Sequence, residues 1–375
     1  DLQVAFMVPT ELLAEQHYLS LKSLLRDSRF RVALLTGSAK AESKRRTVME
    51  IEDGTASLVV GTHSLVQKGV RFRALGLVVI DEQHRFGVLQ RANLRDKGRR
   101  PDVLVMTATP IPRTLALTNY GDLDVSVIRD LPPERIPVKT KVEDESQRED
   151  AYEFVWQQLQ EGRQAYIVYP LVEESAKVDL KAASAMAETL AGRFRDYSVG
   201  LLHGRMNPED REAVMREFAR GALDVLVSTT VIEVGMDVPN ASVMVIEHAE
   251  RFGLAQLHQL RGRVGRGDHQ AYCRLLYKGP LTETGRARLK AIADTTDGFD
   301  IAEQDLQLRG PGEMLGTRQS GLPTLRVANL ARDQDLMETA RTEAVAALRA
   351  DGVSAVILQK LDRTWKERFG LAAIG

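Results

Sequence analysis

Short apolar runs alternate along this chain with longer stretches in which apolar and polar positions recur at helical spacing. Strands that alternate with helices in this way are typical of a parallel sheet covered by helices. In the first third of the chain, the strand-like runs are residues 2–8, 30–37, 57–62, 76–81 and 102–109. A second series comprises residues 164–170, 197–204, 224–230, 241–248 and 271–277. The pattern therefore predicts an α/β fold with two lobes in tandem.

Other signals divide the chain further. The stretch DLPPERIPVKTKVEDESQRED, residues 130–150, is rich in proline and charge, and it predicts a hinge between the lobes. In the second lobe, Asn207 is a good N-cap, Pro208 suits the first helical position and Gly221 ends that helix. We place the boundaries at 1–135 for lobe 1, 136–290 for lobe 2, 291–325 for a helical hairpin with its loop, and 326–375 for a C-terminal helical tail.

Composition limits the classes of partner and compartment. The 51 basic and 52 acidic residues nearly cancel, so no overall field attracts nucleic acid or membrane, and any anion site must be local. The single cysteine, Cys273, excludes an internal disulfide framework, and its alternating surroundings predict a buried structural thiol. Neither a signal peptide nor an apolar run of membrane-spanning length is evident, which predicts a cytoplasmic protein.

An acid pair stands at the end of one predicted strand, in the sequence VVIDEQHRF from Val78 to Phe86. An aspartate in this position can hold Mg²⁺, and an adjacent glutamate can polarise a water molecule for attack on a phosphoryl group. These roles fall to Asp81 and Glu82. The alternative is an ordinary solvated strand end. The next strand ends in TATPIPRT, from Thr107 to Thr114, which predicts a short polar loop beside the acid pair.

A third cluster is QLHQLRGRVGR, from Gln256 to Arg266, with three arginines within six residues. The planar guanidinium suits phosphate oxygens, and an arginine finger stabilises the charge that develops in phosphoryl transfer. A solvated basic helix is the alternative, but it does not explain the glycines at positions 262 and 265.

Together these motifs resemble those of the superfamily-two helicases and translocases. The resemblance rests on DEQH, TATP, the stretch STTVIEVGMDVPNA (228–241) and QLRGRVGR, in that order and with similar spacing. Residues 297–321, with the helix breaker Gly-Pro-Gly at 310–312, resemble the translocation motif shared by RecG and the transcription-repair coupling factor. The stretches 169–183 and 275–281 resemble RecG more closely. The similarity covers nearly the whole chain and is weakest in the last fifty residues.

The resemblance implies two tandem RecA-like domains, with ATP and Mg²⁺ as cofactors. Asp81 is implied to hold Mg²⁺ through water, together with Glu82, which activates the attacking water. The residues implied to complete the nucleotide site are Gln259, Arg263, Arg266, Gly235 and Asp237. Those implied in coupling are His84, Thr107, Thr109, Arg309 and Gln319. Those implied in contacts with DNA are Thr10, Gly61, Thr62, His203, Gly204 and Thr229.

The implied activity is ATP-driven remodelling of branched double-stranded DNA, independent of base sequence, at replication forks and Holliday junctions. The implied protein is monomeric and touches no membrane, and single-stranded DNA-binding protein is a further implied partner. A transcription-repair coupling translocase and an inert DNA-binding or scaffold module stay open as alternatives. The chain contains neither a G-x-x-x-x-G-K-[ST] phosphate loop nor any Gly-Lys dipeptide. We therefore expect a motor fragment, with the phosphate loop and a wedge domain upstream, that hydrolyses no ATP alone.

Overall fold

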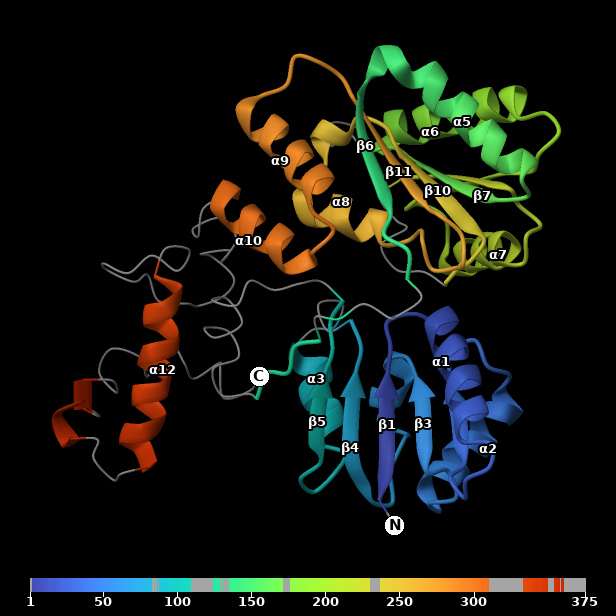
Figure 1. Ribbon diagram of the computed structural model, residues 1–375. Coiled ribbons are helices and arrows are strands. Elements are labelled where there is room, and N and C mark those ends of the chain that lie inside the picture. The colour runs from blue at the N-terminus through green and yellow to red at the C-terminus, as the bar shows by residue number, and fades with distance from the viewer. Residues whose placement is uncertain are drawn as a thin grey trace. The chain divides into compact units, whose positions relative to one another are not determined.

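Two compact units make up the chain: unit 1 comprises residues 1–108 and 354–375, and unit 2 comprises residues 109–353. Each unit contains its own parallel sheet, as Figure 1 shows, so the prediction of two α/β lobes is confirmed. The computed structural model describes residues 2–82, 86, 88–108, 124–128, 130, 135–170, 176–229, 237–309, 333–349, 354–357 and 359–360.

Unit 1 is built around a five-stranded parallel sheet, called sheet A. Its elements are β1 (Gln3–Met7), α1 (Glu11–Leu24), β2 (Val32–Leu35), α2 (Ala41–Glu52), β3 (Leu58–Gly61), η1 (His63–Val66), β4 (Leu75–Ile80), α3 (Val88–Arg95) and β5 (Asp102–Val105). The strand order is β2-β3-β1-β4-β5, so β1 lies at the centre. Ala5 and Met7 on β1 are fully buried, and α1 and α2 pack near β2 whereas α3 packs near β4. All five predicted strands of lobe 1 are present.

Unit 2 is built around a six-stranded parallel sheet, called sheet B, with the order β6-β11-β10-β7-β9-β8. Its elements are β6 (Lys139–Asp144), η3 (Glu145–Gln147), α5 (Arg148–Gln160), β7 (Gln164–Val168), α6 (Ala176–Arg193), β8 (Val199–Leu202), α7 (Pro208–Ala219), β9 (Val225–Ser228), β10 (Ala241–Ile246), η5 (Ala249–Arg251), α8 (Leu254–Arg261), β11 (Tyr272–Tyr277), α9 (Glu283–Asp294), α10 (Gly298–Arg309) and α12 (Gln334–Arg349). Every residue of β7, β9 and β10 is buried, as expected for strands that helices cover on both faces.

The predicted hinge is wrong over its second half, because residues 139–150 form β6, η3 and the start of α5. β6 is an edge strand whose charged side chains are paired. The buried carboxylate of Glu143 lies 2.7 Å from Lys141 Nζ and accepts a hydrogen bond of 2.6 Å from Arg274 Nε. Charged residues are tolerated on an edge strand. Because β6 contains so many charged residues, the sequence pattern did not predict it as a strand.

Unit 2 repeats the strand order of unit 1 and adds one strand. The order β2-β3-β1-β4-β5 corresponds to β8-β9-β7-β10-β11, with β6 beyond β11. A buried glutamine begins the central strand of each sheet. Gln3 Nε2 donates to the carbonyls of Ile51 and Ala56 at 3.0 and 2.9 Å. Gln164 Nε2 makes the equivalent bonds, 2.6 and 2.7 Å, to carbonyls at the end of α7 and just before β9.

The predictions for the ends of α7 and for Cys273 are also confirmed. Asn207 caps α7, since its Oδ1 accepts a 2.8 Å hydrogen bond from Asp210 N, and Gly221 follows the helix with φ of 74°. Cys273 is fully buried, and burial raises the pKa of its thiol to about 12. Among the described residues, no helix has the length and apolarity to cross a membrane.

Candidate functional site

The acid pair lies at the carboxyl edge of sheet A. Asp81 N donates to the carbonyl of Met7 at 3.0 Å, which continues the ladder between β4 and β1. The Asp81 carboxylate is half-buried, and its Oδ1 accepts a 2.9 Å hydrogen bond from Glu82 N. Glu82 has φ of 50°, a left-handed conformation that is uncommon outside glycine and recurs at functional sites. The backbone therefore bends at Glu82, within the acid pair.

His17 is a member of this site that the sequence interpretation missed. Its Nε2 lies 3.4 Å from Asp81 Oδ2, and its ring packs on Phe6 with the centroids 4.8 Å apart. His17 stands on α1 and Asp81 follows β4, and only the pairing of β1 with β4 brings these elements together. Helical spacing alone gives no signal for such a contact.

The donor set at this edge fits Mg²⁺ held through water. Carboxylate oxygens are the ligands that Mg²⁺ prefers, and Mg²⁺ usually keeps several waters and binds one or two protein carboxylates. Asp81 supplies such a carboxylate, half-buried at a strand end, where ligands of parallel sheets gather. Within the described residues, no three His, Cys, Asp or Glu side chains form a metal cluster. Asp81 would therefore share the ion with the bound nucleotide and with water.

Other loops meet at the same edge because all strands of sheet A are parallel. Thr10 caps α1 by accepting a hydrogen bond of 3.3 Å from Leu13 N. Gly61 is required by packing, since a Cβ there would lie 2.4 Å from the carbonyl oxygen of Leu35. The side chain of Thr62 is buried, with its Oγ1 3.5 Å from the hydroxyl of Ser64. Thr10 and Thr62 therefore shape these loops, and their predicted contacts with DNA stay predictions.

Glu11 ties two of these loops together. One carboxylate oxygen accepts hydrogen bonds of 2.7 and 3.0 Å from the backbone N–H groups of Gly37 and Ser38, and the other accepts from the Ser38 hydroxyl. Three hydrogen bonds thus join the start of α1 to the loop after β2. Thr107, predicted to couple the sites, is exposed just beyond β5 at this same edge.

In unit 2, the arginine-rich motif forms the end of α8 and a tight turn. Gly265 has φ of 75°, and a Cβ on Gly267 would lie 2.4 Å from the carbonyl oxygen of Pro239. The turn therefore lies directly on the segment before β10. Arg266 forms an ion pair with Asp237 on that segment, which brings together two residues predicted for the nucleotide site. Glycine at position 265 thus serves the turn geometry.

The three arginines of this motif differ in environment. Arg261 is buried, and its Nη1 donates to the carbonyls of Ile292 and Thr295 at 2.7 and 2.9 Å. It therefore braces α8 against the end of α9. Arg263 is half-buried and Arg266 is more exposed, as groups that reach a ligand must be. Gln259, also half-buried, stands on α8 itself.

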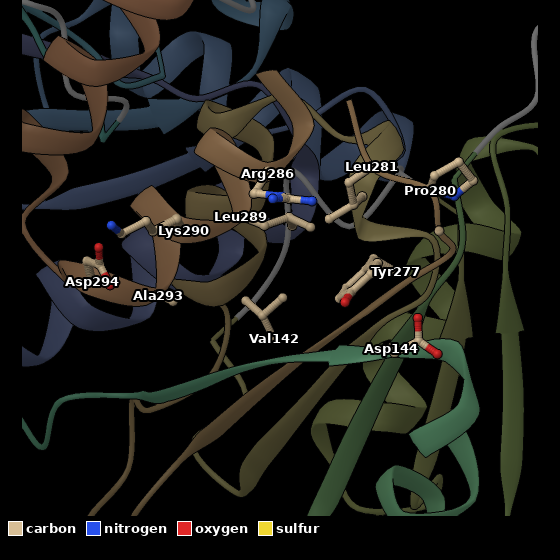
Figure 2. Close-up of a pocket in the computed structure, with 11 residues that line it drawn as sticks. Val142, Asp144, Tyr277, Pro280, Leu281, Arg286, Leu289, Lys290, Ala293 and Asp294 are labelled. Atoms are coloured by element: carbon tan, nitrogen blue, oxygen red, sulfur yellow. The ribbon is translucent and has the colours of Figure 1, made fainter. Parts of the chain in front are cut away.

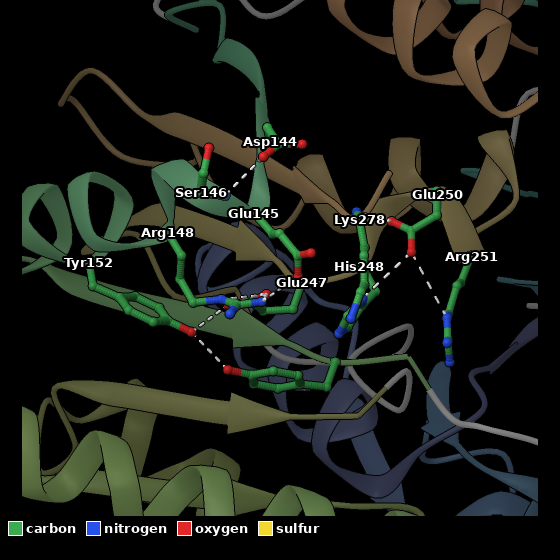
Figure 3. A network of polar contacts seen from close by, with 11 residues as sticks. Asp144, Glu145, Ser146, Arg148, Tyr152, Glu247, His248, Glu250, Arg251 and Lys278 are labelled. Carbon is green, nitrogen blue, oxygen red and sulfur yellow. Dashed lines mark hydrogen bonds and ion pairs between the residues drawn. The ribbon is translucent and has the colours of Figure 1, made fainter. Parts of the chain in front are cut away.

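A second polar cluster occupies the carboxyl edge of sheet B (Figure 3). The carboxylate of Glu247, only 1% exposed, accepts hydrogen bonds of 3.0 Å from both Nε and Nη2 of Arg148. Tyr152 donates to the same carboxylate at 2.6 Å, and the Tyr169 hydroxyl lies 2.8 Å from that of Tyr152. Burial, with the nearby carboxylate, raises the pKa of both tyrosines. The sequence interpretation assigned none of these side chains a role.

The DNA-binding residues predicted in unit 2 lie at the same edge, after β8 and β9. His203 is half-buried; its Nδ1 accepts a 3.3 Å hydrogen bond from Arg205 N, and burial together with Arg205 lowers its pKa. Gly204 is exposed. The side chain of Thr229 is buried, so of these three residues Gly204 is the most accessible. Their contacts with DNA stay predictions.

The groove shown in Figure 2 is separate from these motifs. It has a volume of about 530 Å³ and lies between β6 and α9, with Val142, Tyr277, Arg286 and Lys290 among its lining residues. None of the predicted site residues lines it. His84, Thr109, Gly235 and Gln319 lie outside the described residues, and Arg309 ends α10 without a described side chain.

Family models match the chain in three successive segments. The DEAD/DEAH box helicase model matches residues 1–118, and the helicase conserved C-terminal domain model matches residues 147–268. The model for ATP-dependent DNA helicase RecG, domain 3, C-terminal, matches residues 295–374. A Synechocystis sp. protein named ATP-dependent DNA helicase RecG is 53% identical over 350 residues, covering 93% of this chain and 42% of the relative. The chain is therefore similar to RecG over nearly its whole length.

Further comparisons show the same similarity. The RecG of Streptococcus pneumoniae is 52% identical over 340 residues, which cover 90% of this chain and 50% of that relative. This chain thus spans about half the length of the curated RecG proteins it matches. A solved structure of RecG bound to a three-way DNA junction matches with a TM-score of 0.74 and 49% identity, over 90% of this chain and 44% of that one.

More distant structures share the fold alone. Yeast Dbp5, solved with RNA and ADP BeF3, has a TM-score of 0.54 at 15% identity and covers 92% of this chain and 81% of its own. Two parallel-sheet domains of the RecA-like helicase type are therefore confirmed. The resemblance read from DEQH, TATP and QLRGRVGR is confirmed as well.

Proposed function

We propose that this chain is the motor region of an ATP-dependent DNA translocase that remodels branched DNA during recombination and repair. The observation that carries the proposal is identity of about one half to RecG proteins over nine tenths of the chain, with the acid pair and the arginine turn in the expected order on two parallel-sheet units. The relative solved on a three-way junction supports branched DNA as the substrate.

In this proposal each carboxylate of the acid pair has one task. Asp81 would hold Mg²⁺ through water, and the bound ion would neutralise charge on the phosphate oxygens of ATP. Glu82 would accept a proton from the attacking water. His17, 3.4 Å from Asp81 Oδ2, would orient the aspartate. Arg263 and Arg266 would stabilise charge on the transferred phosphoryl group, assisted by Gln259 and by Gly235 and Asp237 on the preceding segment.

The loops at the carboxyl edges would follow the DNA backbone. Peptide N–H groups and small polar side chains bind phosphate without reading base sequence, which suits a motor that steps along any DNA. The residues proposed for these contacts are Thr10, Gly61, Thr62, His203, Gly204 and Thr229. The residues proposed to couple hydrolysis to movement are His84, Thr107, Thr109, Arg309 and Gln319. A monomeric motor and a contact with single-stranded DNA-binding protein are part of the proposal.

The test uses the longest open reading frame that contains the chain. The Glu82→Gln variant should bind ATP with unchanged affinity and lose hydrolysis, because an amide cannot accept the proton from water. Glu52→Gln, at the exposed end of α2, serves as a matched control and should hydrolyse ATP at the parent rate. Normal turnover by Glu82→Gln on a three-way junction would contradict the assignment.

The same experiment separates the alternatives. Displacement of RNA polymerase without unwinding of junctions would favour a transcription-repair coupling translocase, although the relatives identified above are RecG proteins. Binding of DNA without any ATP turnover would favour an inert module. The chain as printed, without a phosphate loop in its sequence, is expected to show weak, salt-sensitive DNA binding and no ATPase activity.

A further inference from the structure

Glu247 in unit 2 occupies the position that Asp81 occupies in unit 1. Each acid directly follows the strand next to the central strand, β10 beside β7 and β4 beside β1. Glu247 N donates to the carbonyl of Val168 at 2.9 Å, as Asp81 N does to that of Met7 at 3.0 Å. The next residue is left-handed in both units, with φ of 50° at His248 and at Glu82. The chain thus makes the same strand end and turn twice.

The two acids differ in what surrounds them. Asp81 is half-buried, and among the described residues it lies within ion-pair distance of His17. Glu247 is buried, and Arg148 holds it with two parallel N–H donors while Tyr152 donates a third hydrogen bond. Such a two-pronged contact is among the strongest ionic hydrogen bonds. Both carboxylate oxygens of Glu247 are thus engaged within the chain.

The hydrogen bonds continue from Glu247 towards the loops proposed to contact DNA. Tyr152 and Tyr169 join their hydroxyls at 2.8 Å, and Tyr169 begins the loop after β7. Tyr169 N donates to the carbonyl of Ser228 at 2.9 Å, and Thr229 N donates to that of Leu202 at 3.1 Å. The strand ends of β10, β7, β9 and β8 are therefore linked in sequence, from Glu247 to the residue before His203.

We propose that Arg148, Tyr152, Tyr169 and Glu247, here called the Glu247 brace, hold the first residues after β7, β8 and β9 (170, 203–204 and 229) in position for DNA. The four residues act through these strand ends and are positioning residues. This inference rests on the proposed function. Arg148 is the first residue of α5 and Glu247 follows β10, so the brace also fixes α5 to the sheet at the edge where the loops emerge.

The physical argument concerns what DNA binding must order. A loop that is already held in its binding conformation loses less conformational freedom when it binds, so the affinity is higher. The Tyr152–Tyr169 hydrogen bond is the link between the buried ion pair and the loop after β7. Loss of a neutral hydrogen bond of this kind corresponds to a change of about 2- to 10-fold in an equilibrium constant.

The first test is Tyr169→Phe in the longest reading frame that contains the chain, with a three-way junction oligonucleotide as the probe. The half-saturating DNA concentration for ATP turnover should rise about 2- to 10-fold. The turnover rate at saturating DNA and the KM for ATP should stay within about 2-fold, because the nucleotide residues are untouched. Tyr197→Phe is the matched control, since Tyr197 precedes β8 at the opposite edge of sheet B. It should leave all three quantities unchanged.

The second test examines the ion pair. Arg148→Gln should weaken DNA binding more than Tyr169→Phe, and Arg148→Lys should restore part of it, because lysine keeps the charge but loses the planar fork. Glu149→Gln is the control, since it removes an ion pair of 2.5 Å with Arg193 from the exposed side of the same helix. Its DNA affinity should equal that of the parent protein.

The outcomes separate the two proposals. No DNA-stimulated turnover in the parent protein contradicts the proposed function itself. DNA-stimulated turnover with unchanged DNA affinity in both Tyr169→Phe and Arg148→Gln overturns the brace alone. Equal losses of affinity and melting temperature in Tyr169→Phe and in Tyr197→Phe also overturn it, because the effect would then be a general loss of stability.

Discussion

A half-buried histidine should make the stability of unit 2 depend on pH. His258 lies on α8 within the arginine-rich motif, and its pKa is lowered from 6.5 to about 4, first by burial and then by the positive charges of Arg261 and Arg135. Asp297 acts in the opposite direction. The Arg261 Nη2 atom lies 3.1 Å from His258 Nδ1, where a neutral ring can accept a hydrogen bond. A protonated ring would face that guanidinium with a donor.

The direction and size follow from proton linkage. Between pH 6.5 and 4 the unfolded chain binds a proton at this histidine and the folded chain does not, so acid favours unfolding. The stabilisation is fully present above pH 6.5 and is lost as the pH falls towards 4. For a pKa of 6.5 unfolded and about 4 folded, lowering the pH from 7 to 5 removes about 2 kcal/mol.

The measurement is urea unfolding of the chain at pH 7 and pH 5, followed by tryptophan fluorescence. Trp156 on α5 reports on unit 2, and Trp365→Phe removes the other tryptophan of the chain. In this background, His258→Asn should show a pH dependence about 2 kcal/mol shallower than the parent, because asparagine can accept the Arg261 hydrogen bond but does not titrate. His269→Asn, at an exposed position, is the control and should keep the parent slope.

The prediction is tested by comparing how the free energy of unfolding changes with pH in the parent and in His258→Asn. The carboxylates contribute equally to both, so any difference comes from His258. A parent and a His258→Asn variant that lose equal free energy between pH 7 and pH 5 would refute the reasoning. The same result would mean that His258 is protonated in the folded chain at pH 5. Arg261 would then be oriented only by the carbonyls at the end of α9.

Three further predictions test single contacts. In the longest reading frame that contains the chain, Arg266→Ala should lower ATP turnover by about 10³- to 10⁵-fold without lowering the melting temperature, and an unchanged rate would remove it from the nucleotide site. Gly61→Ala should destabilise unit 1 by about 1–3 kcal/mol in urea unfolding, because the new Cβ would lie 2.4 Å from the Leu35 carbonyl oxygen. Gly69→Ala is the control and should not destabilise it, because a Cβ at position 69 has open space around it. Gln164→Ala should cost unit 2 about 2–3 kcal/mol in the same assay, because two buried carbonyls lose their donor, and a loss below about 0.5 kcal/mol would contradict this role.

The sequence predicted every strand of the two sheets except β6, including β5, which is largely exposed. β7, β9 and β10 are buried at every residue, so their apolar runs stand out against the polar helices. The cap at Asn207 was also predictable, because it depends on neighbours within one turn. Such signals are local, and the sequence contains all of the residues that produce them.

What the sequence concealed depends on contacts between distant segments. β6 reads as a charged linker because the partner of Glu143 is Arg274, more than one hundred residues away in the chain. In the sequence, His17 is one of several polar positions on a predicted helix. Its contact with Asp81 depends on the pairing of β1 with β4 and appears only in the folded structure. The sequence also did not show that Arg261 is structural and differs from the other arginines of its motif. The carbonyls that accept its hydrogen bonds belong to α9 and the loop after it.

The two acids that follow β4 and β10 show the limit of motif reading most directly. Both are carboxylates at the end of an apolar strand, and both precede a left-handed residue. The pattern of strand and acid alone assigns the same chemistry to each. The difference is that α5 delivers the guanidinium of Arg148 to Glu247, which satisfies that carboxylate within the chain. A strand-end acid is therefore a candidate for binding a cation only where no arginine or lysine of the same chain reaches it, and that condition can be read from the folded structure but not from the motif.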